Sequence, residues 1–138
     1  MQQLTQEILR LCREYGECRV EAERMEEARR VKNALESVCS MARQRLDISD
    51  PALLLALLDA CEVTRDEGML QEVLDVVGRN LDRLAVSAES VKLLAYCYYY
   101  VEEEECVERA GRMLEELRKM GRGEEELADV ETILEELT

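Results

Sequence analysis

The sequence predicts an all-α protein of about seven helices, arranged as antiparallel helical hairpins, with a compact helical bundle as the alternative. Three observations predict this class. Apolar residues recur with the spacing of an amphipathic helix through almost the whole chain. Short stretches with helix start and stop chemistry, rather than long loops, separate the periodic segments. No stretch alternates apolar and polar residues over more than a few positions, as a half-buried strand would.

The first helix is expected at residues 2–15, where Leu4, Ile8, Leu11 and Tyr15 share one face. Gly16 is its expected stop, because glycine adopts the left-handed conformation at little cost. Residues 18–46 follow without a breaker and are expected to form one long helical stretch. Its second half is strongly amphipathic, whereas its first half is mostly charged and is either a solvated extension or a weak partner of the first helix.

The clearest boundary is at Asp50 and Pro51, since an N-cap acceptor followed by proline at the first helical position marks a helix start. Ser87 is expected to cap a later helix in the same way. Turns are expected at residues 64–68 and 121–123. The helices expected after Asp50 are residues 51–63, 69–84, 88–101, 103–120 and 124–137.

We expect a single all-helical domain over residues 1–138, the usual size of one domain. Its parts are an N-terminal hairpin with a long second helix at 1–48, repeat-like helix pairs at 51–86 and 87–122, and a capping helix at 123–138. A shift of 36 residues places Leu58 on Leu94 and Cys61 on Cys97, which indicates the repeat. The alternative is that any two amphipathic hairpins of equal length align somewhere.

A period of 36 with two helices per unit resembles the tetratricopeptide and pentatricopeptide families of α-solenoids. The segments VKLLAYCYYY and CVERAGRMLEELRKMG are similar to their paired helices. Leu94, Ala95 and Tyr98 match the large–small–aromatic positions of a tetratricopeptide first helix. Val107 and Ala110 match the small packing positions of the second helix.

The resemblance covers at most residues 51–138 and implies a short right-handed α-solenoid that binds proteins or peptides. Glutamates at 102–105 stand where these families have a glycine before the second helix, and the terminal proline of the repeat is missing. Pentatricopeptide proteins typically bind single-stranded RNA. Their base-reading pairs cannot be placed here and the surface is acidic, so that function is not carried over.

The charge of the chain also indicates which classes of binding partner to expect. The net charge is −14, and residues 102–138 carry fourteen acidic and five basic side chains. Such a surface repels phosphate, which argues against nucleic acid and anionic membranes and favours a protein or peptide with a basic surface. No apolar run approaches the roughly 18 residues of a membrane span, and the first residues do not resemble a signal peptide.

Six cysteines fall mostly on apolar stripes, where cysteine behaves as a small hydrophobe: Cys12, Cys18, Cys39, Cys61, Cys97 and Cys106. We therefore expect reduced thiols and an intracellular, reducing compartment. No CxxC spacing and no histidine occur, so neither a metal site nor a cofactor is expected. Without histidine, and without GxGxxG, GxxxxGK[ST], GxSxG or HExxH motifs, no catalytic residues are expected.

Four of the five tyrosines lie within residues 96–100. One interpretation is a central core helix whose phenols reach polar partners at its edge. The other is an aromatic lining for a peptide or partner helix, with Lys92, Tyr96, Tyr99 and Tyr100 as candidate partner-binding residues. Tyr99 shares a face with Lys92 and is expected to be the exposed member.

Glutamates 102–105 are expected to stabilise the start of a helix through its macrodipole. Glu105–Arg109, Glu108–Arg112 and Glu115–Lys119 are expected to pair four residues apart. The functional alternative is a site for a cation or a basic peptide, although no alternating calcium-loop pattern is present.

Three functions stay open on the sequence. The first is a non-enzymatic helical-repeat scaffold or adaptor that mediates protein–protein interaction. The second is a designed helical protein, either without native function or with an installed binding face, because Phe, Trp and His are all absent. The third is a small helical chaperone or regulatory bundle.

Overall fold

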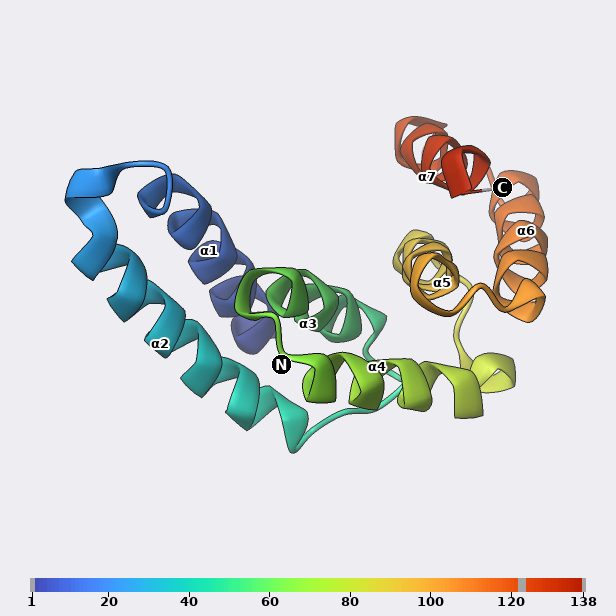
Figure 1. The fold of residues 1–138 in the computed structure, drawn as a ribbon. Helices are drawn as coiled ribbons and strands as arrows, with labels where there is room; N and C mark the ends of the chain where they lie inside the picture. Colours follow the sequence, from blue (N-terminus) through green and yellow to red (C-terminus); the bar gives the residue numbers. More distant parts are fainter. Residues whose placement is uncertain (1, 122–123, 138) are drawn as a thin grey trace. The chain divides into compact units, whose positions relative to one another are not determined.

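Helices account for almost all regular structure in the computed structural model, which describes residues 2–121 and 124–137 (Figure 1). No strand occurs among these residues, so the predicted all-α class is confirmed. The described helices are α1 (Gln2–Cys18), α2 (Met25–Arg43), α3 (Pro51–Thr64), α4 (Glu67–Arg79), α5 (Ala88–Val101), α6 (Glu104–Lys119) and α7 (Glu124–Leu137). Two short 3₁₀ turns, η1 (Ala22–Arg24) and η2 (Leu81–Arg83), follow α1 and α4.

The chain divides into two compact units, residues 1–75 and 76–138, with the boundary inside α4. In unit 1, α1 and α2 lie side by side as an antiparallel hairpin, and α3 packs on α1 and to a lesser extent on α2 (Figure 1). In unit 2, α5 packs on α6, and α7 packs on α5 and to a lesser extent on α6. Each unit is therefore a helical hairpin followed by a helix that packs mainly on the first helix of the pair.

The core of unit 1 is built around α3. Asp50 caps the helix as predicted, because its Oδ1 accepts a hydrogen bond of 3.2 Å from the Leu53 amide and Pro51 occupies the first turn. Helix α3 buries one broad side, and only Asp59 and Glu62 are exposed on it, as expected of a mostly apolar helix. Its buried residues are Leu53, Leu54, Ala56, Leu57, Leu58, Ala60 and Cys61.

In unit 2, the core is built around α5, the first helix of the hairpin. Ser87 caps it as predicted, accepting a 3.1 Å hydrogen bond from the Ser90 amide. The Ser90 hydroxyl is fully buried and donates to the Ala85 carbonyl, so that buried polar group is satisfied. The buried residues of α5 are Ser90, Val91, Leu93, Leu94, Ala95 and Cys97.

The pairs α3–α4 and α5–α6 correspond at an offset of 37 residues, one more than the predicted 36. The N-caps Asp50 and Ser87 are 37 apart. So are the residues that end α3 and α5 in the left-handed conformation, Arg65 (φ 58°) and Glu102 (φ 51°). The starts of α4 and α6 share this spacing, and most burial classes of α3 recur in α5 at the same offset. The apolar alignment alone gave an offset of 36, because α3 and α5 each bury several neighbouring positions and nearby offsets match almost equally well.

The pairs also differ, because α4 does not approach α3 as closely as α6 approaches α5. The two helix pairs therefore correspond more clearly in helix boundaries and burial than in packing.

Gly16 does not stop the first helix, contrary to prediction. The helix continues to Cys18, whose side chain is only 1% exposed and extends the buried stripe of Ile8 and Leu11. An interior glycine costs about 1 kcal/mol, which burial of an apolar side chain offsets.

The predicted unbroken stretch at 18–46 was also wrong. Residues 19–24 lie outside the α-helices, and the last three of them form the η1 turn before α2 begins at Met25. These residues are charged or exposed, and Val20 is 76% exposed, so they have no apolar face to bury.

After residue 50, the observed helix boundaries lie closer to the predicted ones. In the turn at 64–68, Arg65 leaves the helix, and Asp66 caps α4 by accepting a 3.0 Å hydrogen bond from the Met69 amide. Helix α4 therefore begins at Glu67 and includes Gly68, and it ends at Arg79 before η2. Helix α6 stops near Gly121, which has φ +66°, while the predicted stop residues 122–123 lie outside the described residues.

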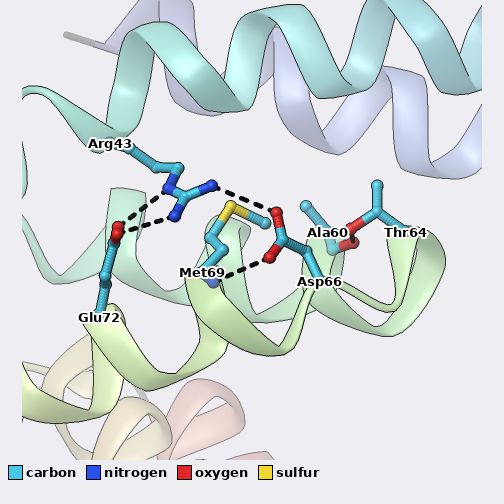
Figure 2. Close-up of polar contacts among 6 residues, drawn as sticks. All are labelled: Arg43, Ala60, Thr64, Asp66, Met69 and Glu72. Carbon is cyan, nitrogen blue, oxygen red and sulfur yellow. Dashed lines mark hydrogen bonds and ion pairs between the residues drawn. The ribbon is translucent and has the colours of Figure 1, made fainter.

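Arg43 joins the end of α2 to the start of α4 (Figure 2). Its guanidinium donates to both carboxylate oxygens of Glu72, at 2.9 and 2.7 Å, and to Asp66 Oδ2 at 3.2 Å. Since Asp66 also caps α4, one arginine holds the cap residue and the second turn of the same helix. The hydrogen bond from Arg43 lowers the pKa of Glu72, so this stabilisation is present at neutral pH and lost on acidification.

Replacing Arg43 by alanine is expected to lower the free energy of unfolding by about 1 kcal/mol, because the pair is bidentate but its carboxylates are 40% and 47% exposed. Chemical denaturation followed by circular dichroism measures the loss. Arg29→Ala is the matched control, since Arg29 is exposed on the same helix and has no ion pair among the described residues. Equal losses in the two variants would refute the role of Arg43.

Candidate functional site

The candidate residues Lys92, Tyr96, Tyr99 and Tyr100 share one side of α5, within an arc of about 100° at about 100° per residue. We call these four residues the α5 face. Tyr99 is 62% exposed, as predicted, whereas the other three side chains are half-buried. The rings of Tyr99 and Tyr100 meet edge to face, with centroids 5.2 Å apart and an interplanar angle of 82°.

The rest of α5 is core. Val91, Leu94 and Cys97 are buried, and α6 and α7 pack on this helix. Tyr98 is half-buried on the side away from the α5 face. The structure therefore brings the four predicted residues together on the accessible side of a central helix; their role in binding stays a prediction.

Residues 102–105 follow directly after the α5 face. Glu102 ends α5 in the left-handed conformation, its amide donating to the Tyr98 carbonyl at 2.7 Å. Glu103 is extended, and Glu104 and Glu105 lie in the first turn of α6, where carboxylates interact favourably with the macrodipole. All four side chains are exposed, and Val101 beside them is 41% exposed.

The predicted pairs Glu105–Arg109, Glu108–Arg112 and Glu115–Lys119 do not form ion pairs among the described residues. On α6 the described ion pair instead joins Arg118 to Glu131 on α7. The arginine thus reaches a neighbouring helix, which sequence spacing within one helix cannot indicate. The negative charge of residues 102–105 is therefore not neutralised within the described part of the chain.

All six cysteines are free thiols, and five are buried. Burial raises the pKa of the Cys39, Cys61 and Cys97 thiols to about 12 and that of Cys12 to about 11. A thiol with such a pKa is neutral at physiological pH and is a poor nucleophile and metal ligand. These cysteines therefore pack as small hydrophobes.

Two further findings concern the described residues. They contain no group of three or more Cys, Asp or Glu placed to hold a metal ion. Among the described helices, none combines the length and the apolar character that a membrane crossing requires.

A groove that the sequence reasoning missed lies between α1 and α2 in unit 1. Its volume is about 890 Å³, and it is lined by Gln3, Leu4, Gln6, Glu7, Arg10, Arg13, Val38, Met41 and Arg45. In the sequence, the polar residues between positions 3 and 13 are spaced so that they lie on one face of a helix. This spacing predicts a solvent-facing side of α1, but it does not reveal that α2 forms the other wall of a groove.

The comparisons with known proteins add no relative. No family model matches the chain, and no curated protein or solved structure matches it either. The likeness of residues 51–138 to tetratricopeptide and pentatricopeptide repeats therefore stays an expectation from sequence. Functional inference rests on the α5 face, residues 102–105 and the groove between α1 and α2.

Proposed function

We propose that this chain is a non-enzymatic helical adaptor that binds a basic segment of a partner protein through the α5 face and residues 102–105. The observation that carries the proposal is Tyr99, which is 62% exposed and lies three residues before the first of the four exposed glutamates at 102–105. An accessible aromatic ring, followed closely in the sequence by carboxylates that form no ion pair within the described residues, suits a peptide that offers both an apolar side chain and a lysine or arginine.

The physical chemistry of the α5 face supports binding. Tyrosine is enriched among residues that dominate interface energy, since its ring gives large contact area and its hydroxyl a polar tip. The contact with Tyr100 restricts the Tyr99 ring before any partner arrives, which reduces the entropy lost on binding. The glutamates at 102–105 would accelerate the approach of a basic partner at low salt.

The sequence supports a non-enzymatic role, because it offers no histidine to act as a general base near neutral pH. The high pKa of the buried thiols supports the same proposal, and it agrees with a reducing intracellular compartment, where thiols persist.

The proposed architecture is a short right-handed α-solenoid. Two observations support it: the offset of 37 residues between helix pairs, and the hairpin-plus-helix packing found within each unit. Stacked hairpins are a common scaffold for binding extended peptides. Small-angle scattering separates a stack from a compact bundle.

Replacing Tyr99 by alanine is expected to weaken binding of basic peptides at least tenfold, the loss of about 1.4 kcal/mol or more that marks an interface hot spot. Peptides selected from a random display library against the whole chain provide the ligands, and fluorescence anisotropy measures Kd. We expect the selected peptides to be enriched in lysine or arginine next to an apolar residue, and their binding to weaken with salt.

Val20→Ala is the control, because Val20 is 76% exposed in unit 1 and lies outside the α5 face. A double Glu104→Gln, Glu105→Gln variant should bind the selected peptides with a weaker dependence on salt concentration than the native chain does. The variant and the native chain should have the same circular dichroism spectrum. Selected peptides that bind native and Tyr99→Ala chains equally would contradict the proposal.

A further inference from the structure

The groove between α1 and α2 belongs to unit 1 and is independent of the α5 face. The α1 wall combines a polar face with Leu4 at its edge. The polar face uses residues 3, 6, 7, 10 and 13, whose spacing of three and four keeps them on one side of the helix. The α2 wall uses Val38, Met41 and then Arg45 just beyond the helix end.

These walls are separate from most of the core. The buried residues of α1 include Thr5, Ile8 and Leu11, which lie on other sides of the helix from the polar wall. The buried residues of α2 are Ala28, Leu35, Cys39 and Ala42. An occupant of the groove would therefore leave the packing of α3 on this hairpin unchanged.

The groove has an apolar floor. Met41 is 57% exposed, and Leu4 and Val38 are half-buried beside it. Methionine adapts its shape to different partners and is common on surfaces that bind helices. Exposure of a large apolar side chain inside a concave surface indicates a place where a partner's apolar side chain can be buried.

The charge of the groove is positive in a chain whose net charge is −14. Arg10 is paired with both Glu7 and Glu14. Arg13 and Arg45 are exposed, and neither makes an ion pair within the described residues. The lining thus holds three arginines and one glutamate, with two guanidiniums available to a ligand.

We infer that this groove binds an acidic amphipathic helix of a partner protein. The valley between two packed helices accepts a third helix at the usual interaxial distance of about 8–10 Å. The occupant's apolar side chains would lie on Leu4, Val38 and Met41, and its carboxylates would pair with Arg13 and Arg45. Guanidinium–carboxylate pairs of this kind are bidentate and set the orientation of the bound helix.

A nucleic acid fits the groove less well. Nucleic-acid sites concentrate basic residues along an extended stripe, and this lining mixes three arginines with a glutamate, two glutamines and an apolar floor. The glutamines Gln3 and Gln6 can donate and accept hydrogen bonds, which suits the polar edge of a bound peptide.

A peptide with the sequence EEELADVETILEEL, that of residues 124–137, is a suitable probe because it is acidic and has an apolar residue every three or four positions. Titrated into the full chain labelled at its methionine methyl groups, it is expected to shift the Met41 resonance and leave Met25 unchanged. Met25 is the matched reference, since it lies on the same helix and is 58% exposed, against 57% for Met41.

Arg13→Glu with Arg45→Glu is expected to weaken this binding at least tenfold. Arg19→Glu with Arg29→Glu changes the net charge equally at exposed sites outside the groove and should have little effect. Met41→Gln should weaken binding severalfold, whereas Met25→Gln should not. All four variants alter exposed side chains, and circular dichroism verifies that each is folded.

The alternative outcomes are distinct. Equal binding of poly-glutamate would show that charge alone acts, and equal binding of single-stranded DNA would reassign the groove to nucleic acid; either overturns the inference. A shift at Met113, buried in α6, in place of Met41 would show that the peptide exchanges with α7 in unit 2, and would equally overturn it. None of these outcomes bears on the Tyr99 experiment.

Discussion

Leu57→Ala is expected to lower the free energy of unfolding by about 3 kcal/mol, within the range of about 2–5 kcal/mol for buried leucines. Leu57 is 0% exposed at the centre of α3, the helix around which the core of unit 1 is built. Truncation removes the transfer energy of the lost methyl groups and leaves a cavity that helices packed on several sides cannot close.

Leu55→Ala provides the control. It makes the same chemical change two residues away, where the side chain is half-buried, so a loss below half that of Leu57→Ala is expected. Urea denaturation followed at 222 nm measures both variants. Since small domains are stable by about 5–15 kcal/mol, the Leu57 change should be visible as a large shift of the midpoint. Similar losses at the two sites would show that α3 is not enclosed as described.

The class and most helices could be predicted because they depend on local chemistry. The caps at Asp50 and Ser87 are hydrogen bonds over three residues, and each was placed correctly from the residue type and its neighbours. The exposure of Tyr99 followed from helical periodicity alone, because residues seven apart lie on nearly the same side of a helix.

The features that could not be predicted depend on contacts between distant residues. Gly16 is helical because Cys18 is buried in the tertiary structure, and that energy is not visible in local sequence. Arg43 reaches Glu72, which is 29 residues away, and Arg118 reaches Glu131 on another helix. The groove between α1 and α2 needs two walls, and helical periodicity describes only one helix at a time.

Raising the pH from 9 to 10.5 is expected to destabilise the fold through its buried cysteines. Burial raises the pKa of the Cys39, Cys61 and Cys97 thiols from the ordinary 9.0 to about 12. Between these values the unfolded chain loses protons that the folded chain keeps, so the free energy of unfolding falls as pH rises. The stabilisation that these protonated thiols give the folded chain is fully present below pH 9 and is lost progressively as the pH rises toward 12.

The expected loss is on the order of 1–2 kcal/mol per thiol over this interval, or a few kcal/mol for the three. The three side chains are only 3%, 6% and 2% exposed, so solvent does not greatly reduce this cost. Urea denaturation under reducing conditions at pH 8, 9, 10 and 10.5 measures the dependence.

A triple Cys39→Ala, Cys61→Ala, Cys97→Ala variant isolates the contribution of the three thiols, because it keeps every other side chain of the native chain. It is expected to be less stable than the native chain at pH 8, since each substitution leaves a small cavity, but to lose much less stability between pH 9 and 10.5. The two stability curves should therefore converge with increasing pH. Parallel curves would mean that the folded thiols ionise as readily as unfolded ones, and that these cysteines are accessible and reactive instead of packed in the core.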